Sequence, residues 1–128
     1  MKSLILCTTL VLISNIANAE WTPLAIGKED AATFIDLESK RKMGNSTEMW
    51  SVVVYLKPRE VGANKKIMSL RELDEFDCKA SKFRATTLIG YSDKLATGSV
   101  VVADYSIGEW VTVPSKSIAE IQWHKACN

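Results

Sequence analysis

The amino-acid sequence predicts an exported α+β domain that is mostly β, with about six strands, a short C-terminal helix and one disulfide. Three observations lead to this prediction. The first nineteen residues have the composition of an export signal, and most of the remaining chain alternates apolar and polar residues at strand spacing. The third is a helix-capping pattern close to the C-terminus.

The N-terminus is predicted to be a secretory signal peptide spanning residues 1–19, followed by one domain at residues 20–128. A short positive start precedes the apolar run Leu4–Ile13, and the segment ends with the small-residue site Ala17-Asn18-Ala19. The apolar run is about ten residues long, whereas a spanning helix needs about 20. An uncleaved anchor is therefore the less favoured alternative. A lipoprotein modified at Cys7 is also disfavoured, because only six residues precede that cysteine.

Cysteine content and charge restrict the remaining possibilities. The chain has three cysteines, and removal of the signal peptide would leave Cys78 and Cys127, an even pair that predicts one disulfide in an exported domain. There are 16 basic and 15 acidic residues, and Lys2 is the only charged residue within the signal. The exported domain therefore has balanced charge, which argues against nucleic acid as a partner.

The first half of the domain contains three predicted strands. Two short ones cover Trp21–Ile26 and Ala32–Leu37, and the strongest covers Met49–Lys57. In the third strand the two faces alternate with a period of two, and both are apolar near its middle, so this strand is placed centrally in the sheet. Its faces are Trp50, Val52, Val54 and Leu56 on one side, and Val53 and Tyr55 on the other. Pro58 is expected to end the strand.

The second half continues the strand pattern. The segment Lys65–Cys78 has helical propensity around residues 71–76, yet an extended strand is preferred because it places Phe76 and Cys78 on one face. Phe83–Tyr91 forms the next strand, and residues 77–81 connect the two. Further strands are predicted at Ser99–Tyr105 and Trp110–Val113.

A helix of about ten residues is predicted to close the chain. Ser117 and Glu120 have the spacing of a capping box, and the helix then continues to Cys127. Trp123 and Cys127 are four residues apart and share one side of it. A helix this short is marginal by itself, so it must dock on the sheet.

Several short motifs occur in a characteristic order: Glu75–Cys78, Lys82–Arg84, Trp110–Pro114, Ser117 with Glu120, and Ala126–Cys127, preceded by Trp21, Phe34–Asp36 and Trp50. In this order they resemble the surface-adhesin protein E-like domain of Gram-negative bacteria, over nearly the whole of residues 20–128. The resemblance implies a single antiparallel sheet packed by the C-terminal helix, with Cys78 bonded to Cys127. It also implies binding of host extracellular-matrix or serum proteins. The best-known members are surface lipoproteins, and this chain lacks a convincing lipobox.

One basic cluster is the candidate ligand-binding site. The cluster comprises Lys79 and Lys82, just before the predicted strand Phe83–Tyr91, and Arg84 within it. Phe83 should be buried, and the side chains of Lys82 and Arg84 are then expected on the opposite face. The cluster is suited to a polyanion or a matrix protein, with binding that weakens as salt rises. The alternative is an ordinary solvated strand face.

An acidic group precedes this cluster: Glu72, Asp74, Glu75 and Asp77. Four carboxylates so close in sequence suggest a calcium site, but the sequence lacks the loop pattern that wraps the ion in such sites. Cross-strand pairing with the three basic residues is the simpler interpretation.

Catalysis is not predicted, so the chain is expected to be no enzyme and to need no cofactor or metal. His124 is the only histidine, and it stands in the last turn of the predicted helix, where the helix dipole favours a cation. The predicted function is therefore an exported, periplasmic or secreted, protein-binding module without stable membrane insertion. The alternative is a periplasmic regulator or inhibitor of a hydrolase. The sequence leaves the oligomeric state open, and a homo-oligomer is one of the options.

Overall fold

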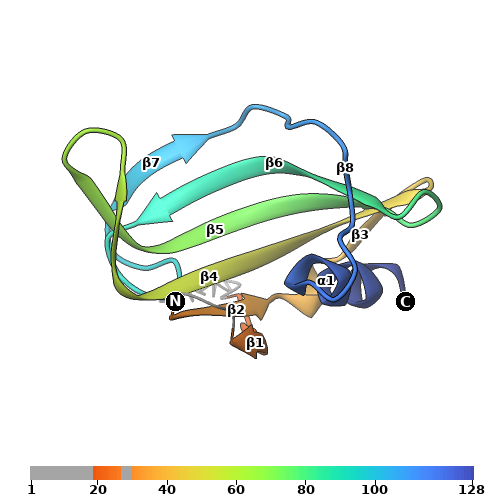
Figure 1. Cartoon of the computed structure of the whole chain (residues 1–128), viewed down its shortest axis with the longest axis horizontal. Helices are drawn as coiled ribbons and strands as arrows, with labels where there is room; N and C mark the ends of the chain where they lie inside the picture. Colours follow the sequence, from red (N-terminus) through yellow and green to blue (C-terminus); the bar gives the residue numbers. More distant parts are fainter. Residues whose placement is uncertain (1–18, 27–29) are drawn as a thin grey trace, which may run out of the picture.

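The computed structural model describes residues 19–26 and 30–128. The predicted signal peptide, including Cys7, lies outside the described residues apart from Ala19, so cleavage after Ala19 stays a prediction. In the described part, eight strands form one antiparallel sheet, and a C-terminal helix packs on it (Figure 1). The mostly-β fold, the single antiparallel sheet and the docked helix are confirmed.

The elements follow one another along the chain with short connections. They are β1 (Thr22–Ile26), β2 (Ala31–Ile35), the 3₁₀ turn η1 (Leu37–Ser39), β3 (Arg41–Met43), β4 (Ser46–Val61), β5 (Lys65–Asp77), β6 (Lys82–Tyr91), β7 (Val100–Asp104), β8 (Val111–Thr112) and α1 (Ile118–Cys127).

The sheet has the order β1-β2-β4-β5-β6-β7, with β3 added beside β4 and β8 beside β6. The long strands β4 and β5 therefore lie in its middle, as predicted for the segment around Val52. Lys65–Cys78 is extended rather than helical, because its apolar residues gain partners on both neighbouring strands. The result is a curved sheet in which β7 and β8 follow β6 along one side (Figure 1).

The prediction that Pro58 ends the central strand is wrong. β4 continues to Val61, and the pairing with β5 shifts between Val54 and Arg59. Pro58 falls inside this irregular stretch, where β4 has more residues than its partner. Proline has no N–H to donate, and a bulge is one of the few places in a strand where that loss is tolerated.

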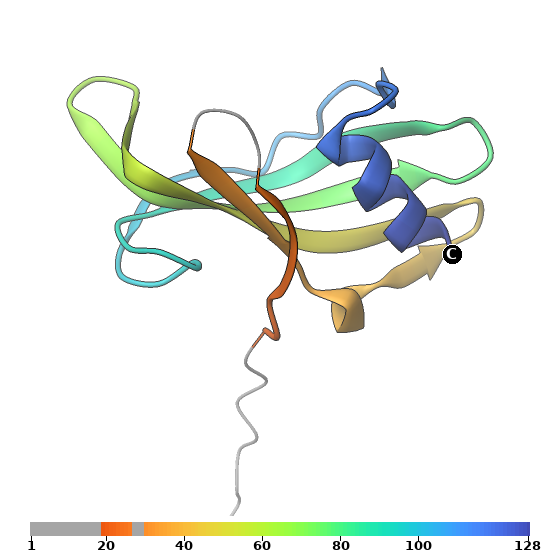
Figure 2. The same cartoon turned by 60° about the horizontal axis from the view of Figure 1, so that its bottom comes forward.

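The hydrophobic core lies between the sheet and α1. Ile35, Met49, Phe76 and Ala126 are almost fully buried and form one cluster. Since they come from β2, β4, β5 and α1, the cluster joins the central strands to the helix. Figure 2 shows α1 lying across this face of the sheet, which we call the helix face.

The helix begins where the sequence predicts. The Ser117 hydroxyl accepts a hydrogen bond of 3.1 Å from the Glu120 backbone N–H, which satisfies one of the unpaired donors at the helix start. Gln122 and Ala126 are buried against the sheet, and Trp123 and Cys127 pack around the core cluster. Among the described helices, none has the length and apolar content needed to cross a membrane.

Candidate functional site

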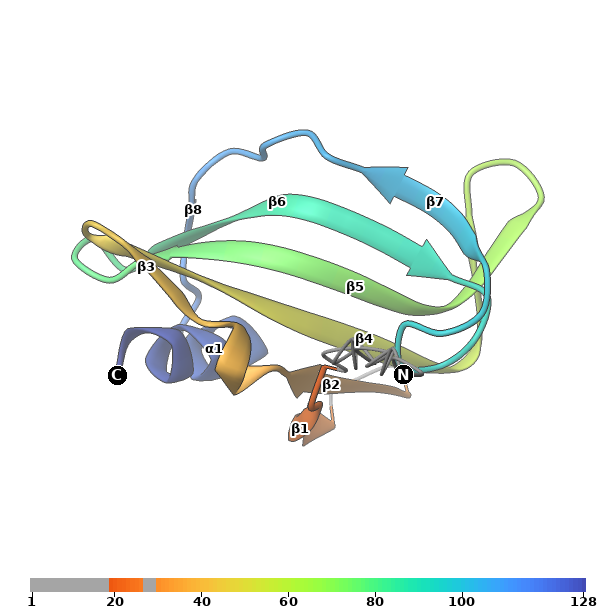
Figure 3. The same ribbon diagram turned by 180° about the vertical axis from the view of Figure 1, so that it is seen from behind.

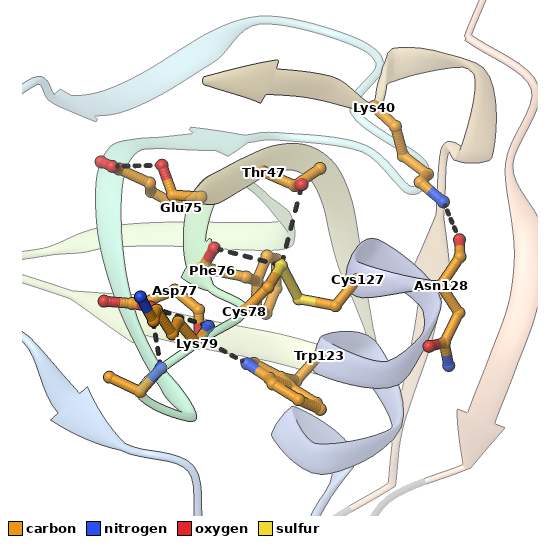
Figure 4. Close-up of a disulfide and its surroundings, with 12 residues drawn as sticks. Lys40, Thr47, Glu75, Phe76, Asp77, Cys78, Lys79, Trp123, Cys127 and Asn128 are labelled. Atoms are coloured by element: carbon orange, nitrogen blue, oxygen red, sulfur yellow. Dashed lines mark hydrogen bonds between the residues drawn. A yellow bond between two sulfur atoms is a disulfide. The ribbon is translucent and has the colours of Figure 1, made fainter. Parts of the chain in front are cut away.

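The disulfide joins the end of β5 to the end of α1. Cys78 and Cys127 are bonded, with their Cα atoms 5.5 Å apart and a sequence separation of 49. Two hydrogen bonds reinforce this junction: the Trp123 indole N–H donates to the Asp77 carbonyl at 2.9 Å, and the Lys40 ammonium donates to the Asn128 carbonyl at 2.9 Å (Figure 4). Both cysteines predicted to pair are therefore structural, and neither is a free thiol.

The turn that follows Cys78 presents two of the predicted binding residues. One carboxylate oxygen of Asp77 accepts hydrogen bonds from the backbone N–H groups of Lys79 and Ala80, at 3.0 and 2.9 Å. The Cys78 N–H donates to the carbonyl of Asn45 at 3.1 Å, which ties the turn to the start of β4. Lys79 on this turn and Lys82 at the start of β6 are both exposed. They form a pair of cations on a well-defined backbone.

Arg84, the third predicted binding residue, is already engaged within the protein. Its guanidinium donates two hydrogen bonds, of 3.0 and 2.9 Å, to Glu75 on the neighbouring strand. The same guanidinium lies 4.3 Å from the centre of the Trp110 ring. Ser46 donates to the other Glu75 oxygen at 2.9 Å. Arg84 thus holds the segment before β8 against the sheet, and Lys79 and Lys82 are the cations left available.

Phe83 separates these cations from the core. It packs against the core cluster, and its ring stacks on Phe76 with centroids 6.3 Å apart. In the ladder, Lys82 is opposite Asp77 and Arg84 is opposite Glu75. The expected alternation, with the aromatic side chain toward the core and the cations on the other face, is present in β6.

The prediction that all four acidic residues pair with these cations is wrong for Glu72 and Asp74. They lie opposite Leu88 and Ala85 in the ladder, and Asp74 is 3% exposed. Burial raises the pKa of Asp74 well above its usual value, and the nearby Glu72 carboxylate raises it further. Burial also raises the pKa of Glu72. The sequence analysis treated the four acidic residues as one group, and a sequence pattern could not show that Asp74 would be covered.

A feature that the sequence analysis missed lies along β7 and the segment leading to β8. Large apolar side chains are exposed there in close succession: Val100, Val102, Tyr105, Ile107 and Val111. β7 pairs with β6 on one side and ends the strand order, so its other side is an open sheet edge among the described elements. We call residues 100–111 the apolar edge. The signal was present in the β-branched run at residues 100–102, but a sequence cannot show which strand ends a sheet.

The remaining candidates considered from the sequence are the histidine and the metal-binding side chains. His124 is exposed on α1 and packs edge-on against Trp123, with ring centroids 5.2 Å apart. Within residues 19–26 and 30–128, no three His, Cys, Asp or Glu side chains gather in a way that could hold a metal ion.

The arrangement defines a class of protein: a small, disulfide-linked antiparallel sheet with a docked C-terminal helix, whose exposed features are an apolar edge and a pair of cations. The family model of surface-adhesin protein E matches residues 21–128. The chain therefore belongs to the surface-adhesin protein E family.

Comparison with solved structures supports the same fold. Crystal form II of Haemophilus influenzae protein E superposes with a TM-score of 0.69 at 13% sequence identity, covering 86% of this chain and 88% of that one. A second structure of Haemophilus influenzae protein E gives 0.67 at 14% identity, covering 86% and 85%. Protein E from non-typeable Haemophilus influenzae gives 0.61 at 13% identity, covering 88% and 76%. A search of curated proteins gives no match.

Proposed function

We propose that this protein is an exported adhesion module that binds an extended segment of a host extracellular-matrix or serum protein along its apolar edge. The single observation that carries the proposal is the succession of exposed apolar side chains from Val100 to Val111, which begins on β7, the strand that ends the sheet, and continues along the segment that leads to β8. An open strand edge offers backbone donors and acceptors to an incoming strand, and alternate side chains supply specificity. Membership in a surface-adhesin family supports a protein as the partner.

Two exposed lysines next to the apolar edge would attract an acidic partner segment. β8 pairs with the start of β6, with Thr112 opposite Lys82, so the end of the apolar edge lies next to the exposed Lys82. Lys79 lies on the turn that precedes β6. These cations would steer an acidic segment toward the edge and would raise the association rate more than the affinity. Arg84 would contribute through Trp110, which it holds beside β8.

Export belongs to the same proposal. The signal peptide at residues 1–19 would be removed after Ala19, and the domain at residues 20–128 would act outside the cytoplasm as a periplasmic or secreted protein. Mass spectrometry of the exported protein should show a chain that starts at Glu20. A chain that retains Met1, or one with a lipid on Cys7, would contradict this part of the proposal.

Binding to a panel of immobilised matrix and serum proteins tests the function. Replacement of Val100 and Ile107 by Asp places two anions on the apolar edge and should abolish binding to the protein that the wild type recognises. Lys79→Glu with Lys82→Glu should weaken binding most at low salt, because exposed charges are screened as salt rises. Arg84 is left unchanged, since its loss would break the Glu75 pair.

The matched control is Lys65→Glu with Lys66→Glu. These lysines are exposed on the β4–β5 hairpin and undergo the same charge change away from the edge. Circular dichroism confirms that each variant is folded. Equal binding by the edge variant and the wild type would refute the proposal. Confinement to the periplasm with co-purification of one hydrolase would instead support a regulator or inhibitor.

A further inference from the structure

The face of the sheet opposite α1 carries a cavity of about 650 Å³. Its floor is formed by Arg71 and Tyr91 on the adjacent strands β5 and β6. Arg71 lies on this face because it is an odd number of positions from Phe76, which points to the helix, and successive strand residues point to opposite faces. The cavity is therefore separate from the core and from the disulfide.

Arg71 is the most unusual group in the cavity. Its guanidinium carbon lies 3.8 Å from the centre of the Trp50 ring, so the two side chains are stacked. The buried Nε atom has no hydrogen-bond partner. The ion pairs among the described residues join Arg41 to Glu48 and Arg84 to Glu75, and neither includes Arg71. A partly buried guanidinium without an anionic partner is costly, and a bound carboxylate would remove that cost.

One wall of the cavity is a loop held in a single shape. The loop follows β6 and folds back toward the start of the described chain (Figure 3). Ser69, which is fully buried, donates a hydrogen bond of 2.6 Å to the Asp93 carbonyl and accepts one of 3.0 Å from the Ala96 N–H. Leu95 and Ala96 both have left-handed backbone conformations, with φ of 55° and 56°. This conformation is uncommon for leucine and alanine, so two such residues in succession indicate that the Ser69 hydrogen bonds define the shape of the loop.

The opposite wall is the 3₁₀ turn η1. Asp36 caps the turn by accepting from the Glu38 N–H at 3.2 Å. The Ser39 hydroxyl accepts from the Trp50 N–H at 2.9 Å and so attaches the turn to the strand that carries the stacked indole. Both walls are therefore fixed to the sheet before any ligand arrives, as is usual for small-molecule sites.

The charges around the cavity select the ligand. Arg71 is the cationic side chain among the lining residues, and the acidic residues Glu20, Asp36 and Glu38 also line the cavity. Trp21 also lines the cavity and adds an aromatic surface. A phosphate group would be repelled by these three acidic residues of the lining. A ligand with one carboxylate and one cationic nitrogen would satisfy both signs of charge.

We propose that the cavity binds a small zwitterion, an amino acid or a dipeptide, with its carboxylate on Arg71, its ammonium group toward Asp36 and Glu38, and its side chain against Trp21. Arginine is suited to this role because its planar fork binds a carboxylate through two parallel hydrogen bonds. The proposal does not depend on the apolar edge, so either proposal can fail without the other.

Calorimetric titration of the purified protein with glycyl-phenylalanine tests the proposal. The wild type should bind this dipeptide and should not bind its C-terminal amide or inorganic phosphate. Arg71→Met should weaken binding roughly tenfold or more, because a hydrogen-bonded charge is lost. Arg41→Met, on the exposed strand β3, is the matched control and should bind as the wild type does.

Two further variants keep the test decisive if Arg71→Met fails to fold. Arg71→Lys retains the charge but not the fork, and Glu38→Gln changes an exposed residue on the rim. Both should weaken binding of the free dipeptide. The proposal would be overturned if the wild type bound the dipeptide and its amide with equal affinity, or if Arg71→Lys and Glu38→Gln bound the dipeptide as well as the wild type does. Tight binding of phosphate, or no heat of binding at millimolar dipeptide, would also overturn it.

Discussion

The disulfide end and the apolar edge of this molecule are built in opposite ways. At the disulfide end, a covalent bond, the Asp77 turn and the Trp123 hydrogen bond all connect the same few elements. At the apolar edge, β7 has a neighbour on one side, and large apolar side chains such as Ile107 are left exposed. One chain thus concentrates its constraints at one place and leaves an open strand edge with exposed apolar side chains at another.

Under the proposed function, the disulfide end stabilises the fold and the apolar edge binds the partner. Exposed apolar side chains in succession contribute little to folding, because they bury little surface, and such patches usually mark interaction sites. The bonded groups at the disulfide end are expected to contribute to the free energy of unfolding and not to binding. Substitutions at the two places should therefore have different consequences for the free energy of unfolding and for binding.

The largest effect on stability is expected from Cys127→Ser. In the chain-entropy treatment, closing a loop of this length contributes about 4 kcal/mol, and loss of a native disulfide costs about 2–5 kcal/mol. Urea denaturation of the wild type and the variant measures the change in the free energy of unfolding. The wild type under reducing conditions is the control and should lose a similar amount. Unchanged stability, or two reactive thiols in the native unreduced protein, would contradict a structural disulfide.

A smaller loss is expected from Gly90→Ala, which tests how β7 is attached. A Cβ atom at Gly90 would lie 2.7 Å from Val102 and 2.8 Å from Ile67. Overpacking of this kind costs about 1–3 kcal/mol. The double variant Gly90→Ala with Val102→Ala should recover part of the loss, because it removes one of the two clashing side chains. No loss in the single variant would show that β7 packs more loosely than described.

Much of this fold could be predicted from the sequence because local patterns determine it. Strand alternation located β4 to β6, and the Ser117 cap located α1. The extent of β4 beyond Pro58 was not predictable, because a bulge depends on how two strands pair. The covering of Asp74 depends on the curvature of the sheet and on elements far away in sequence.

The candidate sites show the same limit. Lys79 and Lys82 were found because a charge on a turn is exposed in almost any fold. The Arg71 cavity was not found, since its loop wall needs left-handed backbone at Leu95 and Ala96, residues that carry no turn signal. Its stacking on Trp50 follows from a pairing register that single-sequence patterns do not specify.

A modest gain in stability is expected from Asp74→Asn near neutral pH. Burial and Glu72 raise the pKa of Asp74 in the folded state, so between the unfolded and folded pKa values the native state binds more protons. Stability should therefore fall as pH rises through that window, and the asparagine variant should lose less. Denaturation midpoints measured across the acidic and neutral range test this, with the exposed Glu60→Gln as control. The prediction would be contradicted if the wild type became more stable as pH rises over that range and the Asp74→Asn variant were less stable than the wild type.

The smallest effect on stability is expected at the apolar edge, from Val100→Thr with Ile107→Thr. Both side chains are exposed, 58% and 66%, and threonine keeps the β-branched shape that suits a strand. Surface substitutions of this kind usually change stability by less than about 0.5 kcal/mol each. Thermal unfolding should therefore barely change, while binding to the partner protein falls because apolar contact area is lost. A large drop in unfolding temperature would show that the edge is packed in the native protein, and the contrast with the disulfide end would then be lost.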